Sequence, residues 1–386
     1  MDSITLSFVV PYRDREVERI ERCLRSLENQ RTTLSYDIVF IDYGSEPFQR
    51  EQAQQTCQKF SKVSYFYYNS YKQLWSRAHA VNLGIRRASG KYIVVVDIDL
   101  IYAPHFIQAL GCKLEEGCFV QYQCYYLPAN FLDYTRLQFD KKYSYPVSSI
   151  SESGGLIAVP RHALEQIGGF DQYFQVWGVE DMDLKKRLRK IGLVQKVLSI
   201  EEAPTFHQWH PSACTEEQMP SLWLKAMEKY ERRKTSLQVP YLNHSIEVSP
   251  ARPALYIKER LPEVLAQGAT LFTFEYPTLQ SYVLFSKVFC ALPSGGALIV
   301  QQTFESIQAN GEARLAKFFK WINSIFAWLS ISYRITEYAT YESELVNFHN
   351  VRDFLFYFIA DNRDKIIDYV FESIYLENIT CILVKK

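Results

Sequence analysis

The chain lacks an excess of charge of either sign, because its 386 residues hold 43 basic and 43 acidic side chains. A balanced chain has no global field to attract nucleic acid or an anionic membrane, so no nucleic-acid partner is expected. No window reaches the ~18 uninterrupted apolar residues of a membrane-spanning helix. What is left is an ordinary folded protein, long enough for two domains.

The eight cysteines form no C-x-x-C pair and no framework of the kind that staples small secreted domains. In a chain of this length we expect free thiols, which are typical of a reducing compartment. The first residues, MDSITLSFVVPYRDRE, carry no basic stretch before an apolar run that stops at Pro11. This start predicts a first strand rather than a signal peptide, and hence a cytoplasmic protein.

The first half of the chain alternates short apolar segments with amphipathic ones. Strands are expected over 4–10, 36–42, 63–68 and 91–97, with helices over 15–29, 51–60 and 76–89. This alternation predicts an α/β domain with a mostly parallel sheet. Such sheets bind ligands at the carboxyl ends of their strands, which brings Asp42 and Asp97 to one crevice.

The later segments complete one domain over 1–235 and predict a second, smaller α/β domain over 254–386. Residues 236–253, with three prolines and scattered polar residues, are expected to link the two domains. The further expected elements are a turn, strand and short helix over 153–170, helices over 180–192, 216–234, 279–292 and 312–330, strands over 270–276 and 297–304, and a closing antiparallel pair over 370–386. No structure is predicted for residues 118–150, which are rich in Tyr and Phe.

Two carboxylates, Asp97 and Asp99, follow the apolar run that ends the fourth strand. If the strand continues that far, the two side chains point to the same side and can share one ligand. Carboxylates together with phosphate oxygens suit Mg²⁺ or Mn²⁺. The alternative is a solvated turn in which Asp99 caps a helix that starts near Pro104.

A second acidic cluster, which includes Glu180 and Asp181, opens the helix expected over 180–192. The helix dipole favours negative charge there by ~0.3–1 kcal/mol, so helix stabilisation is one explanation. It does not account for Trp177 and Gly178 just before the helix. A carboxylate beside an aromatic ring is well placed to deprotonate a sugar hydroxyl.

His207 and His210 stand three residues apart in FHQWHP, a spacing at which two side chains can share one face of a turn. Imidazoles bind Mn²⁺ or Zn²⁺, but they also pack in protein cores. On the residues alone, both interpretations stand.

Seven segments follow one another in the order and spacing of a known family. They are PYRDR (11–15), IDYGS (41–45), WSRAHAVNLGIRRASG (75–90), VVVDIDLIYAPHF (94–106), SGGLIAVPRHALEQIGGFD (153–171), WGVEDMDL (177–184) and FHQWHP (206–211). The series resembles the GT-A glycosyltransferases of family 2, and especially the branch of bacterial chondroitin-type capsule polymerases and metazoan β1,4-galactosyltransferases. The likeness covers about residues 3–234. It implies a GT-A fold, a Rossmann-like mixed sheet with helices on both faces.

The resemblance implies which residues bind the nucleotide. Pro11, Arg13 and Arg15 match the segment that lines the nucleotide pocket. Asp42 matches the acid that recognises uridine, and Arg77 matches a basic residue near the diphosphate. The implied donor is therefore a UDP-sugar.

The resemblance also implies a D-x-D metal site for Mn²⁺ or Mg²⁺. Asp99 matches the direct ligand, and Asp97 is placed nearer the ribose, with the metal as its alternative partner. His210 matches the third ligand of the family, and His207 is the alternative. Gly155 matches a glycine that leaves room for the donor sugar.

For the acceptor side, the resemblance implies that Trp177 stacks on the sugar and that Asp181, of the pair Glu180 and Asp181, is the catalytic base. Val179 departs from the small residue that relatives often have there. The implied activity is metal-dependent, inverting transfer of a hexose or N-acetylhexosamine to a glycan or lipid-linked acceptor, in the synthesis of a surface polysaccharide such as a capsule. The alternative is a catalytically silent glycan-binding or scaffold protein.

The second domain resembles the C-terminal half of a class I methyltransferase, with a P-S-G-G turn before a strand. No Gly-rich cofactor loop precedes it, which implies a degenerate, non-catalytic module for homo-oligomerisation or partner docking. Its apolar helix over 313–333 is expected to pack on its own sheet. The alternative is a helix in the membrane interface, which would attach the protein peripherally at the inner face of a membrane.

Overall fold

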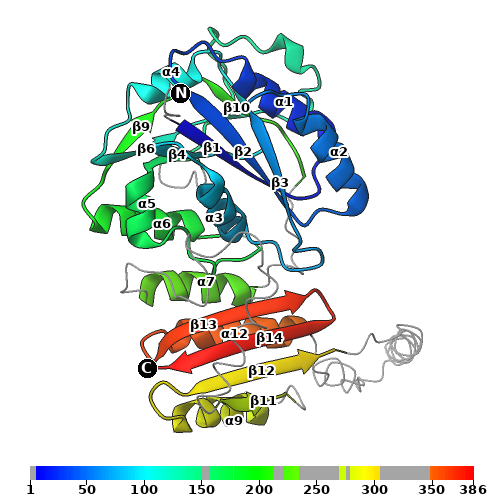
Figure 1. The fold of residues 1–386 in the computed structure, drawn as a ribbon, viewed down its shortest axis with the longest axis vertical. Helices are drawn as coiled ribbons and strands as arrows, with labels where there is room; N and C mark the ends of the chain where they lie inside the picture. Colours follow the sequence, from blue (N-terminus) through cyan, green and yellow to red (C-terminus); the bar gives the residue numbers. More distant parts are fainter. Residues whose placement is uncertain are drawn as a thin grey trace, which may run out of the picture. The chain divides into compact units, whose positions relative to one another are not determined.

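The computed structural model describes residues 6–149, 156–176, 178–211, 221–233, 269–274, 279–304 and 348–386. The chain divides into two compact units, Met1–Lys258 and Glu259–Lys386, each with sheets of its own (Figure 1). The linker expected over 236–253 lies outside the described residues. The domain boundaries drawn from the sequence therefore stay predictions.

The first unit is built on a seven-stranded mixed sheet. Its strands are β1 (Leu6–Tyr12), β2 (Tyr36–Tyr43), β3 (Val63–Tyr68), β4 (Tyr92–Val95), β6 (Cys118–Tyr122), β8 (Ile157–Pro160) and β9 (Val194–Leu198). They stand in the order β3-β2-β1-β4-β8-β6-β9. The first four along the chain pair in parallel, and β8 runs antiparallel to both of its neighbours. This arrangement confirms the expected mixed α/β sheet.

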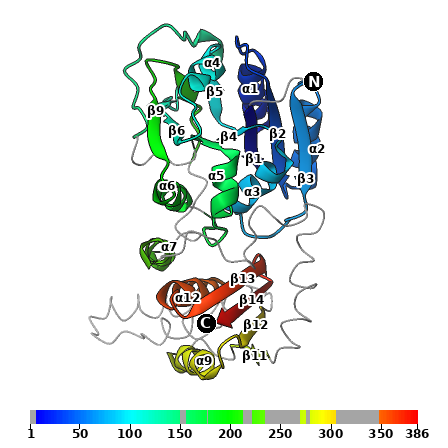
Figure 2. The same ribbon diagram turned by 60° about the vertical axis from the view of Figure 1, so that its left-hand side comes forward.

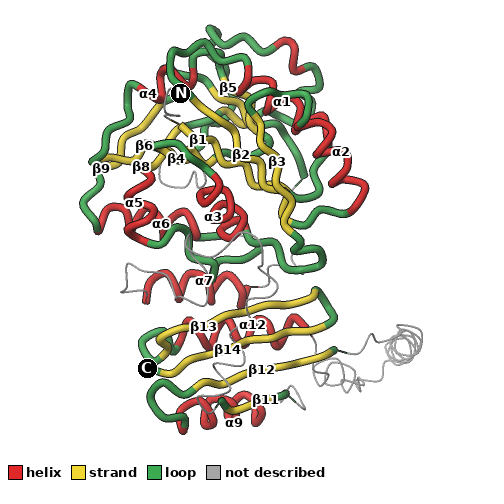
Figure 3. Tube along the Cα trace, in the orientation of Figure 1, coloured by secondary structure: helices red, strands yellow, loops and turns green. Residues whose placement is uncertain are grey.

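Helices cover both faces of this sheet, as Figures 2 and 3 show. They are α1 (Val17–Glu28), α2 (Pro47–Cys57), α3 (Arg77–Arg87), α4 (Phe106–Gly111), α5 (Arg161–Ile167) and α6 (Glu180–Lys190), and a further helix, α7 (Ser221–Arg233), follows later in the same unit. Phe8 and Val10 of β1 pack with α1, α2 and α4, whereas Val9 packs with α3, α5 and α6. Strands covered on both sides must be apolar throughout, which explains why these segments read as continuous hydrophobic runs.

A smaller three-stranded sheet lies beside the end of β4. Its strands are β5 (Leu100–Tyr102), β10 (Thr205–His207) and β7 (Tyr125–Tyr126), in the order β5-β10-β7. The Tyr- and Phe-rich segment supports this sheet, since Tyr125 stacks on Phe206 with ring centroids 5.4 Å apart. Figure 1 shows β10 above the larger sheet. The small sheet is the framework that holds the histidines of FHQWHP.

The second unit contains a four-stranded sheet in the order β11-β12-β14-β13. Its elements are β11 (Thr270–Phe272), α9 (Leu279–Ala291), β12 (Ala297–Thr303), α12 (Phe348–Asp361), β13 (Ile366–Ile374) and β14 (Asn378–Lys385). The closing antiparallel pair is confirmed, while α12 was not expected. The helix expected over 312–330 lies outside the described residues, and the likeness to a methyltransferase stays a prediction. None of the described helices has the length and apolarity to cross a bilayer.

Candidate functional site

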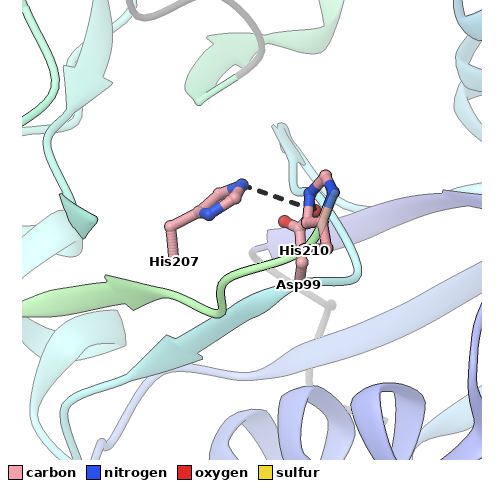
Figure 4. A group of neighbouring side chains, drawn as sticks. All are labelled: Asp99, His207 and His210. Atoms are coloured by element: carbon pink, nitrogen blue, oxygen red, sulfur yellow. Dashed lines mark hydrogen bonds and ion pairs between the residues drawn. The ribbon is translucent and has the colours of Figure 1, made fainter. Parts of the chain in front are cut away.

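Three side chains from two distant parts of the chain form a candidate metal site. Asp99, His207 and His210 each offer one ligand atom, and these atoms lie within 4.8 Å of one another. Nε2 of His210 is 3.0 Å and Nε2 of His207 is 3.5 Å from Oδ2 of Asp99. Figure 4 shows the two rings turned toward the carboxylate. One carboxylate and two imidazoles are a donor set that transition metals such as Mn²⁺ accept.

Strand pairing brings these residues together. β10 pairs antiparallel with β5, so His207 stands opposite Leu100, the residue that follows Asp99. The backbone N–H of Gln208 then donates to the carbonyl oxygen of Asp99 at 2.8 Å. The pairing attaches the segment with Asp99 and the segment with the two histidines to hydrogen-bonded backbone, which limits the movement of the ligand atoms.

The residues present fit a cation. Oδ1 of Asp99 is buried and has no hydrogen-bond partner among the described residues, and an orphaned buried oxygen is costly unless a ligand satisfies it. Nδ1 of His210 is 2.8 Å from the carbonyl oxygen of Pro211, a partner that orients the ring and directs Nε2 toward the site. Burial alone would raise the pKa of Asp99, but the hydrogen bond from His210 and the charge of His207 lower it below its usual value. The same hydrogen bond raises the pKa of His210.

Asp97 is not part of this group. β4 ends at Val95 and residues 98–99 form a turn, so the strand does not continue through Asp99, and the condition under which the two carboxylates could share one ligand is not met. The turn sends the two carboxylates to different partners, and Oδ1 of Asp97 lies 2.8 Å from Nη2 and 3.1 Å from Nε of Arg77. The capping alternative is also wrong, because His105 occupies the N-cap of α4.

Arg77 connects Asp97 to the acidic cluster of α6. Its Nη1 lies 3.3 Å from Oδ1 of Asp181 and 3.9 Å from Oε1 of Glu180. Burial, together with the neighbouring charge of Asp181, raises the pKa of Glu180 to about 7. Burial likewise raises the pKa of Asp181, although Arg77 opposes this shift. The first turn of α6 therefore holds one buried and one largely buried acid, both with raised pKa values, a combination typical of functional sites.

Replacing Glu180 by Gln is expected to stabilise the protein above pH 7. Because its pKa rises from about 4.5 in the unfolded chain to about 7 in the fold, Glu180 binds its proton more tightly when folded, and stability falls as pH rises through this window. The full shift corresponds to about 3 kcal/mol. Urea unfolding should show Glu180→Gln matching the wild type near pH 5 and exceeding it at pH 8. Exposed Glu165 supplies the control, Glu165→Gln, and a less stable Glu180→Gln at pH 8 would contradict the assignment.

The predicted uridine acid, Asp42, lies near the end of β2 and is fully buried. Its Oδ2 accepts a hydrogen bond from the Tyr65 hydroxyl at 2.6 Å, and Oδ1 accepts one from the Ser45 backbone N–H at 2.9 Å. Burial raises the pKa of Asp42, whereas these two donors act against the shift. Tyr65 was not among the predicted site residues, and only its place in a strand next to β2 could have pointed to it.

Arg13 is engaged by the chain itself. Its Nε, Nη1 and Nη2 donate to the backbone carbonyl oxygens of Tyr43, Gln73 and Ser70, at 2.5, 2.8 and 3.0 Å. The guanidinium therefore holds the end of β2 and the segment that follows β3 next to the end of β1. Pro11 is buried in β1, and the carbonyl of Arg15 accepts a hydrogen bond from Tyr12 at 2.9 Å.

Two predicted site residues, Gly155 and Trp177, lie outside the described residues. On either side of Trp177, Val176 and Val179 have φ angles of 59° and 69°, values that are strained for β-branched side chains. Val179 is the N-cap of α6. The approach to the acidic cluster is thus conformationally constrained at the position where the sequence departs from its predicted family.

Residues 7–170 match the family model described as Glycosyl transferase family 2, and residues 136–210 match the N-terminal domain of galactosyltransferase. Chondroitin synthase from Escherichia coli is 24% identical over 246 residues, which are 53% of this chain and 35% of that protein. The chain thus spans about a third of that relative's length.

Two solved structures are distantly similar. The crystal structure of S. aureus TarS has a TM-score of 0.43 and 14% identity, over 67% of this chain and 43% of that chain. The structure of GalNAc-T7 with UDP, GalNAc and Mn2+ has a TM-score of 0.42 and 14% identity, over 59% of this chain and 50% of that chain. The family models and the relative together show that residues 7–170 match a family-2 glycosyltransferase domain.

Proposed function

We propose that the chain transfers a sugar from a UDP-sugar to a glycan or glycoconjugate acceptor, with a divalent cation and with inversion at the anomeric carbon. The carrying observation is the group of Asp99, His207 and His210, whose ligand atoms lie within 4.8 Å of one another. Asp97, two residues before Asp99, contacts Arg77, which in turn contacts Asp181. The candidate metal group and a pair of largely buried acids are therefore connected through Asp97 and Arg77, an arrangement that supports the proposal.

Asp99, His207 and His210 would hold the cation. Two imidazoles beside one carboxylate favour Mn²⁺ over Mg²⁺, because Mg²⁺ prefers a shell of oxygen ligands. When bound, the cation would supply Lewis-acid stabilisation of the departing UDP. On the nucleotide side, Asp42 with its partner Tyr65 is suited to hydrogen bonding with the uracil ring.

Asp181 is the proposed base. It accepts the proton of an acceptor hydroxyl as that oxygen attacks the anomeric carbon, a new C–O bond forms, and the bond to UDP breaks on the opposite face. Asp181 lies closer to Arg77 than Glu180 does, at 3.3 Å against 3.9 Å. The closer guanidinium favours Asp181 as the ionised member of the pair near neutral pH.

A glycan acceptor, such as a growing surface polysaccharide, is consistent with the chondroitin synthase relative. The competing proposal is a silent glycan-binding or scaffold protein. The Glu180–Asp181 pair and both histidines argue against it, because a protein without turnover would be free to lose these groups.

Release of UDP from a panel of UDP-sugars tests the function. One donor is expected to give UDP at a rate that rises with Mn²⁺, responds more weakly to Mg²⁺ and stops with EDTA, because the donor set of the site suits Mn²⁺. Addition of Mn²⁺ after chelation should restore the rate. If no donor is turned over and UDP does not bind in calorimetry, the scaffold proposal holds instead.

A further inference from the structure

Arg77 occupies the centre of the acidic region, where three chain segments meet. It is the first residue of α3, and its side chain is only 15% exposed. Nε and Nη2 both contact Oδ1 of Asp97, while Nη1 faces Asp181 and Glu180 at 3.3 and 3.9 Å. The fork of the guanidinium thus joins the turn after β4 to the first turn of α6.

These contacts differ from those of a diphosphate-binding arginine. One positive charge faces three carboxylates within 4.0 Å. The immediate surroundings of Arg77 are therefore negative and would repel a further anion such as a diphosphate. Its donors are also directed at carboxylate oxygens of the protein. The nucleotide-side role implied by resemblance therefore fits this geometry poorly.

We propose that Arg77 is a positioning residue for the transfer reaction: it fixes Oδ1 of Asp181 and keeps this carboxylate ionised, so that Oδ2 meets the acceptor hydroxyl. This inference rests on the proposed function, in which Asp181 is the base. Arg77 itself touches neither donor nor acceptor.

The charges around Asp181 support the role. Asp181 faces Glu180 from its own helix turn, Asp97 from the turn after β4, Arg77 from α3 and Lys185 one helical turn further along α6. Burial and the charge of Asp97 favour its neutral form, and Arg77 leads the groups that oppose them. Without Arg77, the proton would bind Asp181 more tightly, because a nearby opposite charge is worth about 1–3 pKa units.

The test compares Arg77→Met and Arg77→Lys with the wild type, and with Arg87→Met as a control. Arg87 lies at the other end of the same helix and stacks on Phe66 at 4.2 Å. In Arg77→Met, the acid limb of the kcat–pH profile is expected to move up by about 1–3 units, so that activity lost at pH 6 returns at higher pH. In Arg77→Lys, the acid limb of the profile should lie between those of the wild type and Arg77→Met, since lysine restores the positive charge without the planar guanidinium. UDP affinity in the presence of Mn²⁺ should stay unchanged in all variants.

A weakened UDP affinity in Arg77→Met with an unmoved acid limb would overturn the proposal and favour a diphosphate-binding role. Thermal unfolding from pH 5 to pH 8 gives a readout that does not need activity: the destabilisation by Arg77→Met should grow with pH, as the carboxylates that it leaves uncompensated ionise. A pH-independent loss would contradict the charge role. If the wild type releases no UDP from any donor, the proposed function fails, while this stability measurement still reports on the cluster.

Discussion

Replacing Asp181 by Asn is expected to lower kcat for UDP-dependent transfer by about 10²–10⁴, the usual worth of a general base. The amide keeps the size of the side chain, and its oxygen can still accept the hydrogen bond that Arg77 Nη1 makes at 3.3 Å. It cannot take up the proton of the attacking hydroxyl. UDP binding with Mn²⁺, measured by calorimetry, should therefore stay at the wild-type level while turnover is lost.

Glu180→Gln is the matched control, because it changes a neighbouring acid of the same helix turn. The pKa of Glu180 is about 7, so this side chain is already half protonated near neutral pH, and its amide should cost far less activity than Asp181→Asn. If instead Glu180→Gln abolishes turnover and Asp181→Asn leaves it intact, the base is Glu180 and the assignment of the pair must be reversed.

The larger sheet could be predicted because its signal is local. β1 to β4 lie within one or two residues of the strands expected from short apolar runs between amphipathic segments, and β3 coincides with 63–68. Such runs are imposed by burial on both faces. The helix expected over 180–192 is likewise confirmed by α6. It could be predicted because charged residues and an apolar stripe alternate within its own sequence.

The site geometry could not be read in the same way, because it depends on pairing between distant segments. His207 reaches Asp99 only through the β5–β10 register, and no local pattern marks β5 or the two-residue strand β7. The turn after Val95 also sends Asp97 to Arg77 instead of to the metal group. The two aspartates of the D-x-D motif therefore belong to two separate side-chain clusters, which the sequence alone does not indicate.

The unexpected helix α12 shows a different limit. FHNVRDFLFYFIAD is apolar on most sides, and Val351, Leu355, Phe356 and Ile359 are all buried. A helix that is buried over most of its surface has only a small polar face, so the periodicity that identifies an amphipathic helix is weak. Its short apolar run is equally compatible with a strand until tertiary packing decides.

Replacing Asp99 by Asn is expected to reduce Mn²⁺-dependent UDP release by at least about 10²-fold at a fixed metal concentration. Loss of a residue that only hydrogen-bonds to a metal ligand already lowers metal affinity or activity by about 10–100-fold. The amide keeps the shape of the side chain but loses the negative charge on both oxygens, including the buried Oδ1 that lacks a partner among the described residues. Titration of activity with Mn²⁺ should show the midpoint displaced to higher metal, with partial recovery at saturation.

His210→Gln and His207→Gln separate the two histidines, and His105→Gln is the control, because His105 lies at the exposed start of α4 and binds the carbonyl of Glu202 at 3.0 Å. Both site variants should raise the Mn²⁺ requirement if both rings are ligands, since each Nε2 lies within 3.5 Å of Asp99 Oδ2. An effect confined to His210 would reduce the protein ligands to two. An Asp99→Asn protein that melts like the wild type and keeps its Mn²⁺ midpoint would show that the cation binds elsewhere, because no neutral amide can replace the one carboxylate that joins both imidazoles.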